Sequence, residues 1–283
     1  MPQSIKLTEC PRDAMQGITK FIPTELKAAY INLLLRVGFD TIDFGSFVSP
    51  KAIPQMRDTA AVLSKLDLSN TQSKLLAIIA NYRGAEDAAK HEEITYLGYP
   101  FSISETFQQR NTNSSTFDAF ETVEKIQELC EKMNKKLLVY VSMAFGNPYG
   151  DEWNKYILMS CVDNLHSAGV YDVAVADTIG IATAEQIKDV CSMLSGFASP
   201  VRLHLHSTPG TWREKIEAAY QSGCRLFDTA LKGYGGCPMA KDELTGNIAT
   251  ENVITYLQEQ NEHLGLNLEK LGEAMEFAGR VFD

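Results

Sequence analysis

The sequence has no long apolar segment. No run reaches the ~18 apolar residues that a membrane-spanning helix needs, and the opening residues up to Asp13 contain no apolar core of signal-peptide type. We therefore expect a soluble, cytoplasmic protein that does not enter a membrane.

Basic charge is also scarce. Lys and Arg number 26 against 36 Asp and Glu, and the net charge is −10. Nucleic acids and anionic membranes attract an excess of positive charge, so neither is expected as the main partner. The six cysteines contain no C-x-x-C pair, which excludes the spacing of a zinc ribbon or a thioredoxin-type site. Only Cys237, between Gly236 and Pro238, is expected to be exposed and to have a functional thiol.

What the sequence does contain is a repeated alternation of short apolar strands and longer amphipathic helices over 283 residues. The strands are predicted at 5–10, 41–45, 75–80, 93–98, 137–143, 171–176, 201–206 and 226–231, and the helices between them at 25–37, 84–90, 116–133, 153–168, 184–194 and 213–222. Eight such units are typical of an α/β fold of the (β/α)8 or TIM-barrel type, whereas an open doubly wound sheet usually has fewer. With no linker-like tract, residues 1–283 are predicted to form a single domain. It would end in a closing helix at 250–259 and an additional C-terminal helix at 268–281.

Polar residues follow the carboxyl ends of most predicted strands, where a barrel carries its active site. Packing alone does not explain this gathering, which includes Arg12, Asp13, Asp43, Ser46, Tyr140, Ser142, Asp177, Thr178, His204 and His206. We assign Arg12, Gln16, Ser46, Tyr140, Ser142 and Thr178 to substrate binding. For Asp177 and Thr178, capping of the following turn is an equal alternative.

His204 and His206 form an H-x-H pair on the seventh strand. The two-residue period of a strand places both imidazoles on one face, close enough to bind one metal ion. The alternative is a pair of hydrogen-bonded histidines without a metal. Asp13, at the mouth of the first strand, would add a carboxylate oxygen. This ligand set suits Mg²⁺, Mn²⁺ or Zn²⁺.

Arg12 and Asp43 are candidates for charge and proton chemistry at the same end of the barrel. Arg12 would place a fixed cation against the negative charge of an enolate, or would form only an ion pair with Asp13. Asp43 would act as a general base or orient a neighbour. Alternatively, it would bind backbone amides at its strand end.

Taken in order, several motifs resemble those of the 3-hydroxy-3-methylglutaryl-CoA lyases, a branch of the DRE-TIM metallolyase superfamily. They are Pro11-Arg12-Asp13 with Gln16, Ser46-Phe47-Val48-Ser49-Pro50-Lys51, Asp177-Thr178-Ile179-Gly180, His204-x-His206, Gly235-Gly236-Cys237-Pro238 and Gly246-Asn247. The resemblance covers nearly the whole chain. Asp43 stands where the family has a glutamate, and Ser207 where it has an aspartate.

The resemblance implies a metal held by Asp13, His204, His206 and Asn247, an enolate stabilised by Arg12, and acid–base chemistry by the Cys237 thiol on a mobile loop. The implied reaction is cleavage of an acyl-CoA into acetoacetate and acetyl-CoA, with Asp43 or His204 as base, as in leucine catabolism. A homodimer is expected. The alternatives are a Claisen-condensing synthase, whose relatives usually carry further C-terminal domains, and a metal-binding barrel without catalytic activity.

Overall fold

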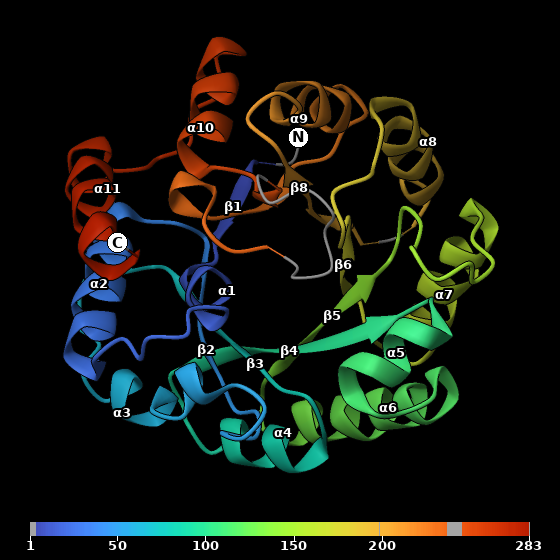
Figure 1. Ribbon diagram of the computed structural model, residues 1–283, viewed down its shortest axis with the longest axis horizontal. Helices are drawn as coiled ribbons and strands as arrows, with labels where there is room; N and C mark the ends of the chain where they lie inside the picture. Colours follow the sequence, from blue (N-terminus) through green and yellow to red (C-terminus); the bar gives the residue numbers. More distant parts are fainter. Residues whose placement is uncertain (1–3, 198, 237–244, 283) are drawn as a thin grey trace.

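The computed structural model describes residues 4–197, 199–236 and 245–282, and these form a closed barrel of parallel strands surrounded by helices (Figure 1). The barrel order is β1 (Lys6–Glu9), β2 (Thr41–Ser46), β3 (Lys74–Ile78), β4 (Ile94–Ser102), β5 (Lys136–Ser142), β6 (Asp172–Ala176), β7 (Arg202–His204) and β9 (Leu226–Thr229). β9 pairs in parallel with β1 and closes the ring. The predicted (β/α)8 fold is confirmed.

The outer layer consists of the helices that follow the strands. They are α2 (Thr24–Val37), α3 (Thr59–Leu63), α4 (Tyr82–Ala89), α6 (Thr116–Lys132), α7 (Lys155–Ser167), α8 (Ala184–Leu194), α9 (Trp212–Gln221) and α10 (Thr250–Glu259). The additional helix α11 (Leu268–Phe282) is confirmed, and it packs against α2, where Phe277 stacks on Tyr30 (Figure 1). Within the described ranges, no helix is both long and apolar enough to cross a membrane.

The strands are buried on both faces, as expected when helices cover a parallel sheet. Their outward side chains join the large core between strands and helices. Their inward side chains form a smaller cluster within the barrel, which includes Leu76, Tyr96, Leu138 and Tyr140. This inner cluster separates the two ends of the barrel.

Short elements missed by the sequence prediction lie in the loops. They are α1 (Pro11–Gln16), the 3-10 turns η1 (Pro54–Met56) and η2 (Leu231–Gly233), and α5 (Glu105–Thr112). The sequence prediction also missed α3, which is the helix that follows β2. Helices α1, α3 and α5 have eight residues or fewer, too few turns for a clear amphipathic period. The prediction of one strand over 201–206 was wrong, because β7 ends at His204. His206 belongs to β8 (His206–Ser207), which pairs antiparallel with β10 (Gly246–Asn247) outside the barrel.

Candidate metal and catalytic site

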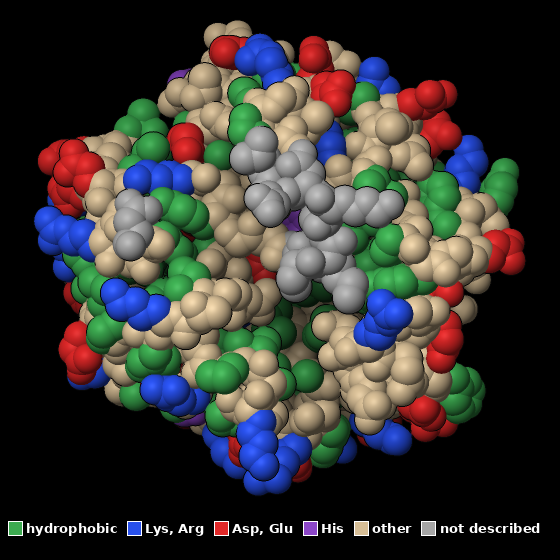
Figure 2. All heavy atoms as spheres, in the orientation of Figure 1, with side chains coloured by type: hydrophobic (Ala, Val, Ile, Leu, Met, Phe, Trp, Pro, Cys, Tyr) green, Lys and Arg blue, Asp and Glu red, His purple; other side chains and the backbone are tan. Residues whose placement is uncertain are grey.

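A cavity of about 390 Å³ opens at the carboxyl ends of the barrel strands. Figure 2 views this face, where histidine and acidic side chains are visible beside the central hollow. Eight of the residues predicted for the site line the cavity, namely Arg12, Asp13, Gln16, Tyr140, Ser142, Thr178, His204 and His206. The residues predicted for the site therefore meet in one cavity at this end of the barrel.

Asp13, His204 and His206 each place a potential ligand atom so that all three atoms lie within 4.8 Å of one another. Local geometry explains how the residues meet. Asp13 lies in α1, which begins directly after β1, and His204 ends β7. The break after β7 turns the chain at Leu205, and the β8–β10 pairing sets Asn247 opposite His206.

Hydrogen bonds set the tautomer of both imidazoles. His206 Nδ1 donates to the Thr178 carbonyl oxygen at 2.9 Å, and His204 Nδ1 lies 3.3 Å from Asp228 Oδ2. A ring whose Nδ1 carries the proton keeps the lone pair on Nε2, the arrangement typical of metal-binding histidines. His206 Nε2 is buried and has no hydrogen-bond partner among the described residues.

The protonation states of His206 and Asp13 also suit a divalent cation. Burial, reinforced by the charge of His204, lowers the pKa of His206 to about 4, so this imidazole is neutral near pH 7. Burial disfavours a charged Asp13, but the charges of Arg12 and His204 outweigh it and lower the pKa of that carboxyl. Burial likewise opposes protonation of His204, yet the hydrogen bond and charge of Asp228 raise its pKa.

The residues present therefore fit a metal ion. Two imidazole nitrogens and a carboxylate form a mixed donor set that zinc, manganese and magnesium accept. The orphaned Nε2 of His206 is a buried polar atom that lacks the partner such atoms normally have. Asn247 lies beside the set, because its Nδ2 donates to Asp13 Oδ2 at 2.7 Å and to the Tyr234 carbonyl at 2.9 Å.

Cys10 and Asp228 form a second close group with His204. Burial, followed by the charge of Asp228, raises the pKa of the Cys10 thiol well above its usual value. A protonated thiol is a poor metal ligand. Asp228 is already bound to Arg202 and His204, so its role here is to orient His204.

Arg12 is held in a single orientation by contacts on two sides. Its Nε lies 3.0 Å and its Nη2 2.6 Å from Asp43 Oδ2, while Nη1 donates to Asp13 Oδ1 at 3.1 Å and to Gln16 Oε1 at 2.8 Å. Asp43 is 1% exposed and is not among the cavity-lining residues. Burial raises its pKa to about 6 against the opposing charge of Arg12. The ion pair leaves Arg12 as a preorganised cation at the cavity wall.

Asp177 and Thr178 serve different purposes. Asp177 accepts from the Ala182 amide at 3.0 Å and pairs with buried Lys215 at 2.7 Å. Lys215 also donates to the His206 carbonyl at 2.7 Å, so this ion pair supports the backbone of the site. Thr178 lines the cavity and its hydroxyl accepts from the Met143 amide at 2.8 Å.

The other predicted residues are placed as follows. The Tyr140 hydroxyl is buried without a partner in the described chain, and its ring packs edge-on at 5.8 Å from His204. Ser46 is buried and does not line the cavity. Cys237 lies outside the described residues. Gly235, two positions before it, has φ +86, and a Cβ there would lie 2.8 Å from Asn247 Nδ2 and 2.9 Å from Asp13 O. Glycine is therefore required where this loop crosses the cluster.

Sequence reasoning missed the contribution of α5, which brings Phe107, Asn111 and Thr112 to the cavity wall. A usable signal was present. Ser104 caps the helix by accepting from the Phe107 amide, and serine followed by an acidic residue is a common helix start.

Comparison with known proteins agrees with this geometry. The HMGL-like family model matches residues 5–278. Mouse mitochondrial hydroxymethylglutaryl-CoA lyase is 32% identical over 98% of this chain and 85% of its own length. The crystal structure of the Bacillus subtilis HMG-CoA lyase has 32% identity and a TM-score of 0.92, covering 99% of this chain and 95% of that one. An HMG-CoA lyase from Acinetobacter baumannii, solved with coenzyme A and 3-methylmalate, has 30% identity and a TM-score of 0.90, covering 99% of this chain and 91% of that chain. With the match spanning nearly the whole barrel, the chain belongs to the HMGL-like family.

Proposed function

We propose that this protein is a metal-dependent carbon–carbon lyase that cleaves 3-hydroxy-3-methylglutaryl-CoA into acetoacetate and acetyl-CoA. The observation that carries the proposal is the Asp13, His204 and His206 cluster in one cavity with Arg12, within a chain of this family. Relatives of about 32% identity that cover nearly the whole chain are named hydroxymethylglutaryl-CoA lyases.

A divalent ion held by Asp13, His204, His206 and Asn247 would act as a Lewis acid toward the 3-hydroxyl group of the substrate. Loss of the hydroxyl proton lets the C3 oxygen become a ketone as the C2–C3 bond breaks. The electron pair of that bond moves into the thioester and forms an enolate. Arg12 faces the cavity and supplies a fixed positive charge for the enolate oxygen.

Asp43 is better suited to positioning than to proton removal. Both of its oxygens contact Arg12, and the side chain is buried and does not line the cavity. Of the two predicted bases, only His204 lies on the cavity wall. Its Nδ1 faces Asp228 and its Nε2 is assigned to the ion, so we assign the hydroxyl proton to solvent water in the cavity rather than to His204. Protonation at C2 completes acetyl-CoA, and we assign that proton to the Cys237 thiol on the loop that follows Gly236.

Gln16, Tyr140, Ser142 and Thr178 are assigned to substrate binding, since their side chains share the cavity with Arg12. Ser46 is assigned to supporting the β2 end instead, since it is buried. We further propose Mg²⁺ or Mn²⁺ as the ion, a cytoplasmic location, and a role in leucine catabolism. A homodimer is supported by Phe117 and Tyr156, which are 72% and 65% exposed beside one apolar groove.

The direct test is turnover of purified protein with 3-hydroxy-3-methylglutaryl-CoA and Mg²⁺ or Mn²⁺, with acetoacetate and acetyl-CoA measured separately. Equal amounts of both products are expected, and a chelator should abolish their formation. Release of free CoA from acetyl-CoA plus a 2-oxo acid, with no cleavage of the hydroxymethylglutaryl thioester, would replace the lyase with a condensing synthase. Sedimentation of the protein tests the dimer.

A further inference from the structure

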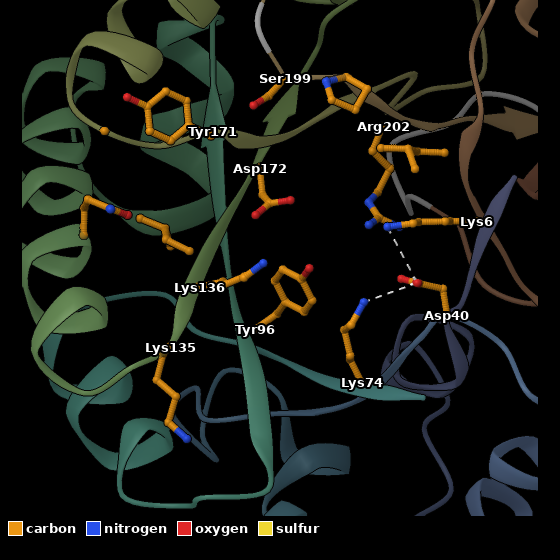
Figure 3. Close-up of a pocket in the computed structure, with 15 residues that line it drawn as sticks. Lys6, Asp40, Lys74, Tyr96, Lys135, Lys136, Tyr171, Asp172, Ser199 and Arg202 are labelled. Atoms are coloured by element: carbon orange, nitrogen blue, oxygen red, sulfur yellow. Dashed lines mark hydrogen bonds and ion pairs between the residues drawn. The ribbon is translucent and has the colours of Figure 1, made fainter. Parts of the chain in front are cut away.

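A second large cavity, of about 540 Å³, lies at the opposite end of the barrel (Figure 3). Its walls include the first residues of five barrel strands, which are Lys6, Lys74, Lys136, Asp172 and Arg202, and Asp40 just before a sixth. The inner core cluster separates this cavity from the one that holds Arg12 and Asp13. Neither the proposed reaction nor the family match assigns it a role.

The cavity is positively charged, although the chain as a whole carries a net charge of −10. Five cationic side chains line it against two acidic ones. Lys6 and Lys74 share one carboxylate, Asp40, at 4.0 and 3.3 Å. Lys136 has no carboxylate within 4.0 Å in the described parts of the chain, and its ammonium lies 5.8 Å from the Tyr96 ring centre. Positive side chains this close together repel one another, and a bound anion would offset that repulsion.

Arg202 gives an independent indication. It is only 4% exposed, and its Nη1 contacts Thr8 and, at 3.1 Å, Asp228. Its Nε is buried with no hydrogen-bond partner among the described residues. A buried guanidinium normally satisfies its donors, and this one, which lines the cavity, keeps one donor unused.

Figure 3 shows the side chains of Lys6, Lys136 and Arg202 extending toward the centre of the cavity, whereas Lys135 points away. The Lys135 ammonium instead donates to the carbonyl oxygens of His91 at 2.7 Å and Ile94 at 2.8 Å. Asp172 also points inward (Figure 3) and opposes an anion. The cations available to a ligand are therefore Lys6, Lys74, Lys136 and Arg202.

We propose that this cavity binds a small phosphate-bearing anion. Lysine ammonium groups and an arginine fork are the side chains that proteins use most for phosphate oxygens. The volume exceeds that of phosphate alone and lies in the range of small-molecule sites. Tyr171, which is 56% exposed at the rim, offers a ring surface to the organic part of a phosphate ester.

The test is calorimetric titration of the full-length protein with inorganic phosphate at low ionic strength. Arg202 is left intact, because it also contacts the Asp228 that orients His204. Lys74→Gln and Lys136→Gln should each weaken phosphate binding roughly tenfold, the loss expected for one charge-assisted contact. Asp172→Asn removes an opposing charge and should strengthen binding. Lys188→Gln, an exposed change on α8 outside the cavity, is the matched control and should have no effect.

Unchanged affinity in both lysine variants would overturn the proposal, as would weaker binding in Asp172→Asn. Citrate binding at this face without phosphate binding would overturn the assignment to phosphate. Circular dichroism and lyase turnover, expected to be normal in all these variants, report folding independently. The outcome is separate from that of the proposed lyase activity, since phosphate titration needs neither metal nor acyl-CoA.

Discussion

The contact between Arg12 and Asp43 allows the proposed chemistry to be tested quantitatively. Arg12 is predicted to stabilise the enolate, and Asp43 to act only by holding Arg12 through contacts of 2.6 to 3.2 Å. Losing one preorganised oxyanion-stabilising donor typically costs about 10²- to 10³-fold in kcat, or ~3–4 kcal/mol. Arg12→Gln should show such a loss, while KM changes by only a few-fold because the enolate charge is absent from the bound substrate.

Asp43→Asn keeps the size of the side chain but removes its charge, and its amide nitrogen would face a guanidinium N–H. The expected loss in kcat is about 10- to 100-fold, within the ~0.5–3 kcal/mol usual for coupled neighbours. If Asp43 acts only through Arg12, the double variant should be no slower than Arg12→Gln alone. The assay is steady-state turnover at saturating metal for all four proteins.

The free energy of unfolding of the same single and double variants provides a second test. Arg12→Gln leaves the buried Asp43 carboxylate without its main partner, which should cost roughly 3–5 kcal/mol of unfolding free energy. The double variant removes both charges and should recover much of that loss. Rate losses that multiply in the double variant would refute the positioning role and identify Asp43 as a base in its own right.

Three further predictions concern other parts of the barrel. His206→Ala removes one metal ligand and should lower bound divalent metal sharply in elemental analysis while the barrel stays folded; unchanged metal content would disprove the cluster. Cys237→Ala should reduce kcat far more than it weakens metal binding, and full activity would make the thiol dispensable. Burial raises the pKa of Glu9 to about 8 from 4.5, so the folded state keeps a proton that the unfolded chain releases. Its contribution to stability is complete below about pH 4.5 and falls, by at most about 1.4 kcal/mol per pH unit, up to about pH 8. Glu9→Gln should remove this decline in denaturant titrations, and an identical decline in the variant would contradict the assignment.

The sequence alone determined the architecture and pointed to the end of the barrel at which the candidate site lies. Strand and helix periodicities are local properties, so the eight units could be found without knowing how they pack. The H-x-H spacing and the Arg12-Asp13 pair indicated metal and charge chemistry because both follow predicted strands, and the carboxyl ends of barrel strands open into a common space.

Tertiary structure decided which of these polar residues act on one another. Arg12 and Asp43 are 31 positions apart, and only the pairing of β1 with β2 brings them together. The chain leaves the barrel at Leu205, and the antiparallel pairing of β8 with β10 places His206 opposite Asn247. Each of these strands has only two residues, so no local pattern in the sequence predicts their pairing. The cavity lined by Lys6, Lys74, Lys136 and Arg202 likewise depends on closure of the barrel, because these residues begin four separate strands. Long-range contacts of this kind follow from the packing of the whole chain, and a local periodicity carries no information about them.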